Sequence, residues 1–244
     1  MPNLKLYKIK SEILLRKFGN RFGVDVKMTD EEILMKQINH NKIDLIFDIG
    51  ANEGQFAELI FKMGYKGRIV SFEPLTSAYK ILFQKSEKYT NWEVAERFAI
   101  GESDGEIILH ISENTLSSSA LDILEEHTKA APDSVYTGEE KVKVYKLDTI
   151  GKKYLKDSKN IFLKIDTQGF EEKILNGANE FLKDVKGLLV ETSLVKLYEG
   201  QALFPKIYSM IIEKGFELWG MEPAFVNKET GRMLQADAIF FRAI

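Results

Sequence analysis

The feature that most constrains this chain is a glycine-bearing turn between an apolar run and an amphipathic segment. It follows the apolar residues 43–47 and has the sequence Asp48-Ile49-Gly50-Ala51-Asn52-Glu53-Gly54. Apolar residues then recur at helical spacing, namely Phe56, Leu59, Ile60 and Met63. We therefore predict a strand at 45–48, a tight turn and a helix at 54–63. In an α/β fold, a nucleotide-like ligand binds at such a turn.

The carboxylate of Asp48 narrows the choice of ligand. A dinucleotide brings an anionic pyrophosphate to the backbone N–H groups at the helix start, and an acid at the strand end would repel it. S-adenosylmethionine (SAM) instead brings a sulfonium and an ammonium group, both cationic, which a carboxylate suits. The turn alone is equally compatible with a strand-to-helix connection that binds nothing. If the turn binds a ligand, these residues favour SAM and therefore methyl transfer.

Apolar, strand-like runs alternate with helical patterns along the rest of the chain. The alternation predicts an α/β fold, with a Rossmann-like, mostly parallel central sheet and helices on both faces. Strands are expected at 45–48, 68–73, 92–100, 161–166 and 187–192, and helices at 54–63, 75–88, 169–178 and 204–214. The last two apolar runs, 216–221 and 236–242, are expected to form a terminal antiparallel strand pair.

The length of 244 residues fits one large domain with an N-terminal extension. We place the extension at 1–40 and the domain at 41–244. A Ser-rich, acidic insertion or lid is expected at 113–140, between strand patterns at 106–112 and 141–147. Basic and apolar residues are interspersed over 1–20. They predict an amphipathic helix that packs on the domain or on a second subunit, which would make the protein a homo-oligomer.

Composition limits the function classes further. The formal net charge is −3 without a long basic run, so we expect no nucleic-acid partner. The chain has no cysteine, which excludes disulfides, thiolate catalysis and Cys-ligated zinc. No stretch approaches the ~20 apolar residues that cross a bilayer, and no compact apolar signal region is present. The expected location is the cytoplasm.

Further acids follow the expected strands. Glu73 ends the second strand, where a carboxylate can accept hydrogen bonds from ribose hydroxyls; it could equally complement a helix start. Lys164 and Asp166 are two residues apart, so they share one face of a strand, and Glu191 ends another strand. The three residues predict either a polar cluster beside the reacting groups or a purely structural buried ion pair.

The chain resembles the FkbM family of SAM-dependent methyltransferases. The matching blocks are Phe47-Asp48-Ile49-Gly50-Ala51-Asn52-Glu53-Gly54-Gln55, Phe72-Glu73-Pro74-Leu75, Lys164-Ile165-Asp166-Thr167-Gln168-Gly169-Phe170-Glu171 and Ile174-Leu175-Asn176-Gly177-Ala178. The resemblance extends over about residues 45–241. It implies a class I Rossmann-like domain and O-methylation of a sugar, glycan or natural product. The family commonly has Glu where Gln168 stands.

The resemblance also implies roles for individual residues. Asp48, Gly50, Asn52 and Gly54 would surround the methionine part of SAM, and Glu73 would hold the ribose. The residues expected to border the adenine are Pro74, Leu75, Phe98, Ala99 and Ile100. We extend the cofactor-binding set to the neighbouring residues Ile49, Ala51, Gln55 and Phe56.

An alcohol is a weak nucleophile, so we expect a general base near the acceptor. The candidates are Asp166 first, then Lys164 if burial lowers its pKa, with Glu191 as the third member of the catalytic set. His110 and His127 are alternatives, each expected to lie on the surface. Ser118, Ser119 and Tyr198 are predicted to bind the acceptor, although the serines could instead cap a helix near residue 120. No tight ligand motif supports a metal.

Two alternatives stay open. An NAD-dependent oxidoreductase on the same fold would need a turn without the acid and a Tyr/Lys or His catalytic pair. A non-catalytic module that binds SAM or a protein partner would need no base. The acceptor is expected to be a small molecule or a carbohydrate, and these motifs do not specify it, because acceptor loops vary freely on this fold and function belongs to the site rather than to the scaffold.

Overall fold

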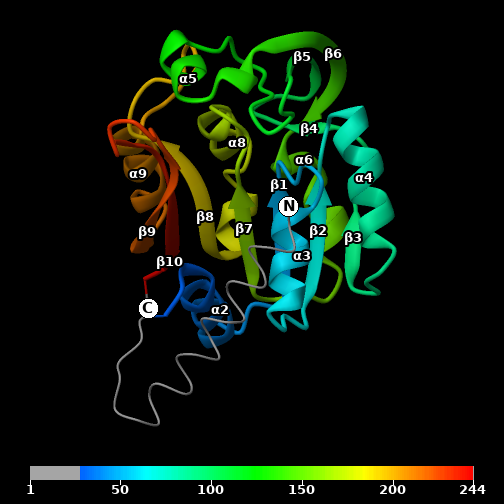
Figure 1. Ribbon diagram of the computed structural model, residues 1–244. Helices are drawn as coiled ribbons and strands as arrows, with labels where there is room; N and C mark the ends of the chain where they lie inside the picture. Colours follow the sequence, from blue (N-terminus) through cyan, green and yellow to red (C-terminus); the bar gives the residue numbers. More distant parts are fainter. Residues whose placement is uncertain (1–27, 244) are drawn as a thin grey trace.

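Strand β1 (Leu45–Ile49) is buried along its whole length, as expected for the centre of a sheet covered on both faces. The computed structural model describes residues 28–243. It places β1 in a seven-stranded sheet of order β3-β2-β1-β7-β8-β10-β9 (Figure 1). The other strands are β2 (Arg68–Phe72), β3 (Trp92–Val94), β7 (Ile161–Ile165), β8 (Val185–Ser193), β9 (Phe216–Val226) and β10 (Met233–Arg242).

The direction of the strands confirms the expected fold class. Neighbouring strands from β3 to β8 pair in parallel, while β10 runs antiparallel to both β8 and β9. The sheet is therefore mostly parallel with a terminal antiparallel pair. The chain leaves β1 towards β2 on one side and returns to β7 on the other. This reversal is the switch point at which open α/β sheets bind ligands.

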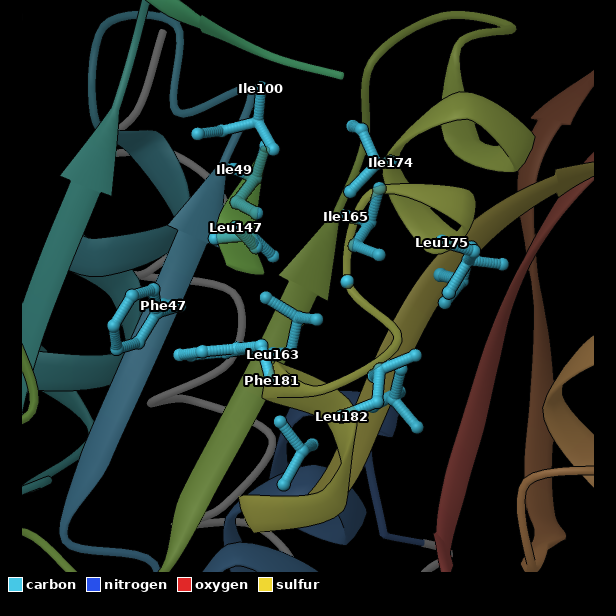
Figure 2. Packing of buried hydrophobic residues seen from close by; sticks show 14 of the residues in the cluster. Phe47, Ile49, Ile100, Leu147, Leu163, Ile165, Ile174, Leu175, Phe181 and Leu182 are labelled. Atoms are coloured by element: carbon cyan, nitrogen blue, oxygen red, sulfur yellow. The ribbon is translucent and has the colours of Figure 1, made fainter. Parts of the chain in front are cut away.

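Side chains along the central strands β1 and β7 alternate between two apolar layers, as the pleat requires. Phe47 and Leu163 belong to one layer, together with residues of the helices α8 and α9. Ile46 and Phe162 belong to the other, together with residues of α2 and α3. Figure 2 shows the first layer, where side chains of β1 and β7 meet those of α8 and the 3₁₀ helix η2. Each fully buried aliphatic or aromatic side chain contributes about 1.5–3 kcal/mol.

Helices cover both faces, as expected. One face carries α2 (Asp30–His40), α3 (Gln55–Lys62) and α4 (Thr76–Ser86). The opposite face carries α6 (Leu147–Ile150), α7 (Lys152–Leu155), α8 (Glu171–Asn176), η2 (Phe181–Asp184) and α9 (Phe204–Ile212). Helix α2 falls within the expected extension 1–40, and the helix expected over 1–20 lies outside the described residues. No helix in the range 28–243 has the length and apolar character needed to cross a membrane.

A second, three-stranded sheet of order β4-β6-β5 lies beside the large one (Figure 1). It contains β4 (Ala99–Ile100), β5 (Gly105–Ser112) and β6 (Tyr136–Tyr145), and β5 and β6 pair in an antiparallel way. Between them lie α5 (Glu125–Ala130) and the 3₁₀ helix η1 (Pro132–Ser134). The excursion from the β5–β6 pair is thus residues 113–135, because β6 already begins at Tyr136, within the expected insertion 113–140.

Two expectations of local structure are wrong. The strand expected over 92–100 is two strands, because the chain leaves the large sheet after β3 and joins the small one at β4. No helix begins near residue 120; α5 begins at Glu125. The hydroxyl of Ser119 is instead used within the loop, where it accepts a hydrogen bond from the backbone N–H of Leu121 at 3.1 Å.

Candidate functional site

A cavity of about 370 Å³ opens at the carboxyl ends of the parallel strands. Its size is that of a small-molecule site, about 300–1,000 Å³. Its walls come from the turn after β1, the end of β2, the region of β4, the segment after β7, the loop 114–120, helix α5 and the last two strands. Three acids line it, namely Glu73, Asp166 and Glu191, and none of the lining residues in the described part of the chain is Lys or Arg.

The turn after β1 has the backbone geometry that its sequence predicts. Gly50 has φ +73°, and Asn52 also adopts a left-handed conformation at φ +46°, so Asn52 does stand where a second glycine is common. A Cβ on Gly50 would lie 1.8 Å from the carbonyl oxygen of Asp166. Glycine is therefore required here for two reasons, its positive φ and the close approach of the segment after β7.

Glu73 fastens this turn to the end of β2. Its Oε2 accepts a hydrogen bond from the backbone N–H of Asn52 at 2.8 Å, and its Oε1 accepts one from Leu75, also at 2.8 Å. Burial raises the pKa of Glu73 to about 7, although the two backbone donors and Lys164 oppose the shift. Because each carboxylate oxygen retains acceptor capacity, Glu73 can still receive the hydroxyls of a ligand that enters the cavity.

Asp48 lies behind the cavity wall and is fully buried. It stands opposite Lys164 in the β1–β7 register and opposite Ser71 in the β1–β2 register. Its Oδ2 accepts a hydrogen bond from the hydroxyl of Ser71 at 3.1 Å, and its Oδ1 lies 3.1 Å from Nζ of Lys164. In this structure, the cation next to the Asp48 carboxylate is therefore the ammonium group of Lys164. A direct contact between Asp48 and a bound ligand stays a prediction.

Lys164 is held as a cation. Burial favours its neutral amine, but the charges of Asp48 and Asp166 outweigh burial and raise the pKa of Lys164 above its ordinary value. Its Nζ also donates a hydrogen bond to the carbonyl oxygen of Gly50 at 3.0 Å. The condition under which Lys164 could act as a base, a lowered pKa, is not met, so that expectation is wrong. The structure instead joins Lys164 to the glycine turn.

Gln168 links the two acids at the far side of the cavity. Its Nε2 donates hydrogen bonds to Oδ1 of Asp166 at 3.0 Å and to Oε2 of Glu191 at 2.7 Å, while its Oε1 accepts one from the hydroxyl of Tyr198 at 2.9 Å. The reverse amide orientation would place an oxygen against two carboxylates. Gln168 holds this position with φ +54°, a strained conformation for a non-glycine residue.

Glu191 is the second acid that Gln168 holds. Its Oε2 accepts a second hydrogen bond, from Nε2 of Gln235 at 2.7 Å. Burial, followed by the charges of Asp166, Asp237 and Glu171, raises the pKa of Glu191 well above its ordinary value. With Oε2 occupied by two amide donors, Oε1 is the oxygen that can carry or take a proton.

The cavity gathers part of the predicted site. The predicted residues that line it are Ile49, Gly50, Asn52, Glu73, Pro74, Leu75, Phe98, Ala99, Ile100, Ser118, Ser119, Asp166 and Glu191. The predicted residues that do not line it are Asp48, Ala51, Gly54, Gln55, Phe56, Lys164 and Tyr198. Gly54 has a packing reason to be glycine, because a Cβ there would lie 2.6 Å from the Trp92 ring.

The predicted acceptor residues also hold parts of the site together through hydrogen bonds. Ser119 donates a hydrogen bond to the carbonyl oxygen of Gln168 at 2.7 Å, and Ser118 accepts one from the backbone N–H of Ser112 at 3.0 Å. Tyr198 is fully buried, and its hydroxyl holds Gln168. The loop 113–119 is thereby connected to the segment after β7.

Sequence reasoning missed several lining residues. Phe225 and Gln235 reach the cavity from β9 and β10, and Ala131 and Ala224 also line it. His127, which the sequence suggested only as an alternative base, lines the cavity from α5. The expectation that His127 lies on the surface is wrong, since only 3% of it is exposed. Burial lowers the pKa of His127 to about 4, so the imidazole is neutral near neutral pH. No group of three or more His, Asp or Glu residues within 28–243 is arranged to hold a metal ion.

The order of the sheet, its antiparallel final strands and a cavity at the switch point are those of the class I methyltransferase fold. The sequence model for the methyltransferase FkbM domain matches residues 48–218. The chain therefore belongs to the FkbM family of SAM-dependent methyltransferases, as its motifs indicate. Among curated proteins, none matches the chain by sequence at a significant level.

Three solved structures are similar to this chain at low sequence identity. A methyltransferase FkbM from Methylobacillus flagellatus KT is 15% identical, with a TM-score of 0.49 over 82% of this chain and 43% of that one. Aeropyrum pernix fibrillarin in complex with SAM is 9% identical, with a TM-score of 0.46 over 81% of this chain and 66% of that one. Magnesium protoporphyrin IX methyltransferase from Synechocystis PCC 6803 with bound SAM is 10% identical, with a TM-score of 0.47 over 87% and 77%. The chain thus spans less than two thirds of the first two.

Proposed function

We propose that this chain transfers the methyl group of SAM to a hydroxyl of a small-molecule or carbohydrate acceptor, with Glu191 as the general base. The observation that carries the proposal is the state of Glu191. Its carboxyl group lines the cavity, its pKa is raised, and its Oε1 accepts no hydrogen bond from an amide side chain within residues 28–243. A carboxylate with an ordinary pKa is a poor base for an alcohol, whereas one with a raised pKa is better matched to the task.

The cavity fits a cationic cofactor. Three acids line its walls, and no Lys or Arg among residues 28–243 does so, which favours a ligand that carries a sulfonium and an ammonium group. Glu73 would hold the ribose hydroxyls, the turn around Gly50 and Asn52 would contact the methionine part, and residues 98–100 would contact the adenine. When bound, SAM supplies a methyl group already activated by its sulfonium sulfur.

The protein's own residues then have two tasks. The walls must hold the acceptor oxygen in line with the methyl group, since positioning supplies much of the rate enhancement in such transfers. Oε1 of Glu191 takes the hydroxyl proton as the oxygen attacks. Gln168 and Gln235 keep the Glu191 carboxyl group in one orientation through their hydrogen bonds to its Oε2.

The part of the cavity that we assign to the acceptor favours a neutral molecule with hydroxyl groups. It is lined by small polar side chains, namely Asn114, Thr115, Ser117, Ser118, Ser119 and Gln235. A phosphate-rich acceptor such as a nucleic acid needs Lys and Arg contacts, which the lining lacks within residues 28–243. Family membership disfavours the NAD-dependent alternative. A non-catalytic SAM-binding module is the outcome that the assays below must separate from an enzyme.

Two measurements test the proposal. Calorimetry with S-adenosylhomocysteine should show binding, and the absence of binding by the folded protein at millimolar ligand would overturn the cofactor assignment. A screen with methyl-labelled SAM, glycans and small alcohols should then yield a methyl ether identified by mass. Tight S-adenosylhomocysteine binding without transfer to any acceptor would instead favour a non-catalytic module.

A further inference from the structure

We propose that His127 is an acceptor-binding residue, whose neutral imidazole donates a hydrogen bond from Nε2 to an oxygen of the acceptor. The proposal rests on the proposed function and adds a specificity-determining contact to it. His127 lines the cavity although it is almost fully buried. It lies on α5, in the segment 113–140 that none of the family motifs covers.

The position of the imidazole is fixed by its surroundings. Its ring packs edge-on against Tyr198, with ring centroids 5.1 Å apart, and lies tilted against Phe225, with ring centroids 5.3 Å apart. The start of α5 is tied to the loop after β8 by two backbone hydrogen bonds, from Leu124 N–H to the Leu197 carbonyl and from Glu199 N–H to the Asp122 carbonyl, both 2.8 Å. A contact made by His127 is therefore made at a defined place in the cavity.

The two ring nitrogens differ in their surroundings. Nδ1 is sealed from solvent and has no hydrogen-bond partner among the described residues. A neutral imidazole carries one N–H and one lone pair, and a buried unpaired donor is rarer than a buried unpaired acceptor. This assigns the lone pair to Nδ1 and the hydrogen to Nε2, the nitrogen that remains available to the cavity.

The assignment gives His127 and Glu191 complementary tasks. Glu191 can take a proton from the hydroxyl that is methylated, whereas Nε2 of His127 has a hydrogen and cannot act as that base. A donor suits an acceptor that offers a second oxygen, such as a vicinal hydroxyl or a ring ether. The Phe225 ring beside His127 adds an apolar surface, as expected for a ring-shaped acceptor.

The first test compares three variants of His127. His127→Phe keeps the buried ring and removes both nitrogens, His127→Gln places an amide nitrogen near the Nε2 position, and His127→Asn reaches only the Nδ1 position. The probe is the best acceptor among the methyl α-glycosides of glucose, galactose, mannose and rhamnose and cyclohexane-1,2-diol. We expect His127→Phe and His127→Asn to raise its KM about tenfold, the loss of one hydrogen bond, and His127→Gln to rescue most of the loss.

A purely structural role for His127 predicts that the acceptor KM changes together with thermal stability. Our proposal predicts instead that acceptor binding weakens without a loss of stability. Replacing a buried, unpaired nitrogen with carbon removes a desolvation cost, so His127→Phe should unfold at the same or a higher temperature than the wild type. S-adenosylhomocysteine affinity should not change. An unchanged acceptor KM in His127→Phe, or a loss that follows thermal stability across the three variants, would overturn the proposal.

A spectroscopic readout is available because the chain has three histidines. With ¹⁵N-labelled histidine and S-adenosylhomocysteine present, addition of the same acceptor should shift the Nε2 resonance of His127, which the His127→Gln variant identifies by its absence. An unshifted Nε2 resonance at a saturating acceptor concentration would also overturn the proposal. If the wild type methylates neither a member of the panel nor any acceptor in the wider screen of glycans and small alcohols, the proposed function fails and the His127 proposal fails with it. Activity of the wild type therefore distinguishes the two failures.

Discussion

Lys164 and Asp48 form a buried ion pair across neighbouring parallel strands, with 3.1 Å between Nζ and Oδ1. The side chain of Asp48 is fully buried and that of Lys164 is 7% exposed. The same ammonium group donates to the carbonyl oxygen of Gly50 and lies 3.5 Å from Asp166. One cation therefore connects the glycine turn, the acid before it and the acid after β7.

Removal of this cation should destabilise the fold strongly. In Lys164→Met, Asp48 remains as a buried charge without its partner, which costs about 3–5 kcal/mol of unfolding free energy. The double variant Asp48→Asn/Lys164→Met should lose less than the sum of the single variants, by about 0.5–3 kcal/mol. Urea denaturation measures these values, and Lys186→Met, at an exposed position on β8, is the control. Additive losses would contradict the coupling.

Glu171 should make stability depend on pH. Its Oε1 accepts hydrogen bonds from the backbone N–H groups of Thr167 and Gly169 and from the Thr167 hydroxyl, yet burial raises the pKa of Glu171 to about 7. Between pH 4.5, which equals its ordinary pKa, and about pH 7, the folded state binds a proton that the unfolded chain releases. The contribution of Glu171 to the free energy of unfolding is therefore full below pH 4.5. It is lost as pH rises through 7, and the loss is roughly 3 kcal/mol at most.

The variant Glu171→Gln isolates this contribution, because the amide oxygen can still accept these hydrogen bonds while the charge is gone. The unfolding free energy of this variant, measured in urea at pH 4.5 and pH 8, should increase relative to that of the wild type as pH rises. Glu172→Gln, next to it and less buried, should show no such gain. A constant difference between wild type and Glu171→Gln across this range would contradict the assignment of the proton to Glu171.

The alternation of apolar residues made much of the fold predictable. Phe47 and Ile46 face opposite apolar layers, as their adjacent positions require, and the antiparallel final pair follows from two apolar runs joined by a polar turn. The boundary between the two sheets was not predictable in this way. The residues between β3 and β4 include Ala95 and Phe98, which are as buried as strand residues.

The candidate site was predictable where its residues are local in sequence. Gly50, Asn52 and Glu73 closely follow the ends of the first two strands. The backbone geometry of the turn follows from its residue types. The charge state of Lys164 was not predictable, because it depends on the register that sets it opposite Asp48. His127 and Phe225 meet across 98 positions of the chain, and a lone sequence carries no signal for that contact.

Glu191 should control the acid side of the pH–rate profile. If its Oε1 takes the acceptor proton, kcat/KM for the acceptor rises with pH through the raised pKa of Glu191 and then levels off. Glu191→Gln should lower kcat by about 10²–10⁴-fold and remove this rise, without weakening the binding of S-adenosylhomocysteine. The control is Glu199→Gln, at an exposed position in the loop after β8. An unchanged profile in Glu191→Gln would move the base elsewhere, with Asp166 as the next candidate.

Gly50 should tolerate no side chain. In Gly50→Ala the new Cβ would lie 1.8 Å from the Asp166 carbonyl oxygen, so the segment after β7 must move. The φ of residue 50 is positive, which strains alanine, so the backbone of the turn must change as well. Strain and overpacking together should cost about 2–5 kcal/mol and abolish S-adenosylhomocysteine binding. Gly64→Ala separates the two effects, because Gly64 also has a positive φ, +102°, but nothing lies within 4 Å of its Cβ position. It should lose only about 1–2 kcal/mol in thermal unfolding and keep its affinity in calorimetry. Equal losses in the two variants would show that conformational strain alone, and not contact with the segment after β7, makes glycine necessary at position 50.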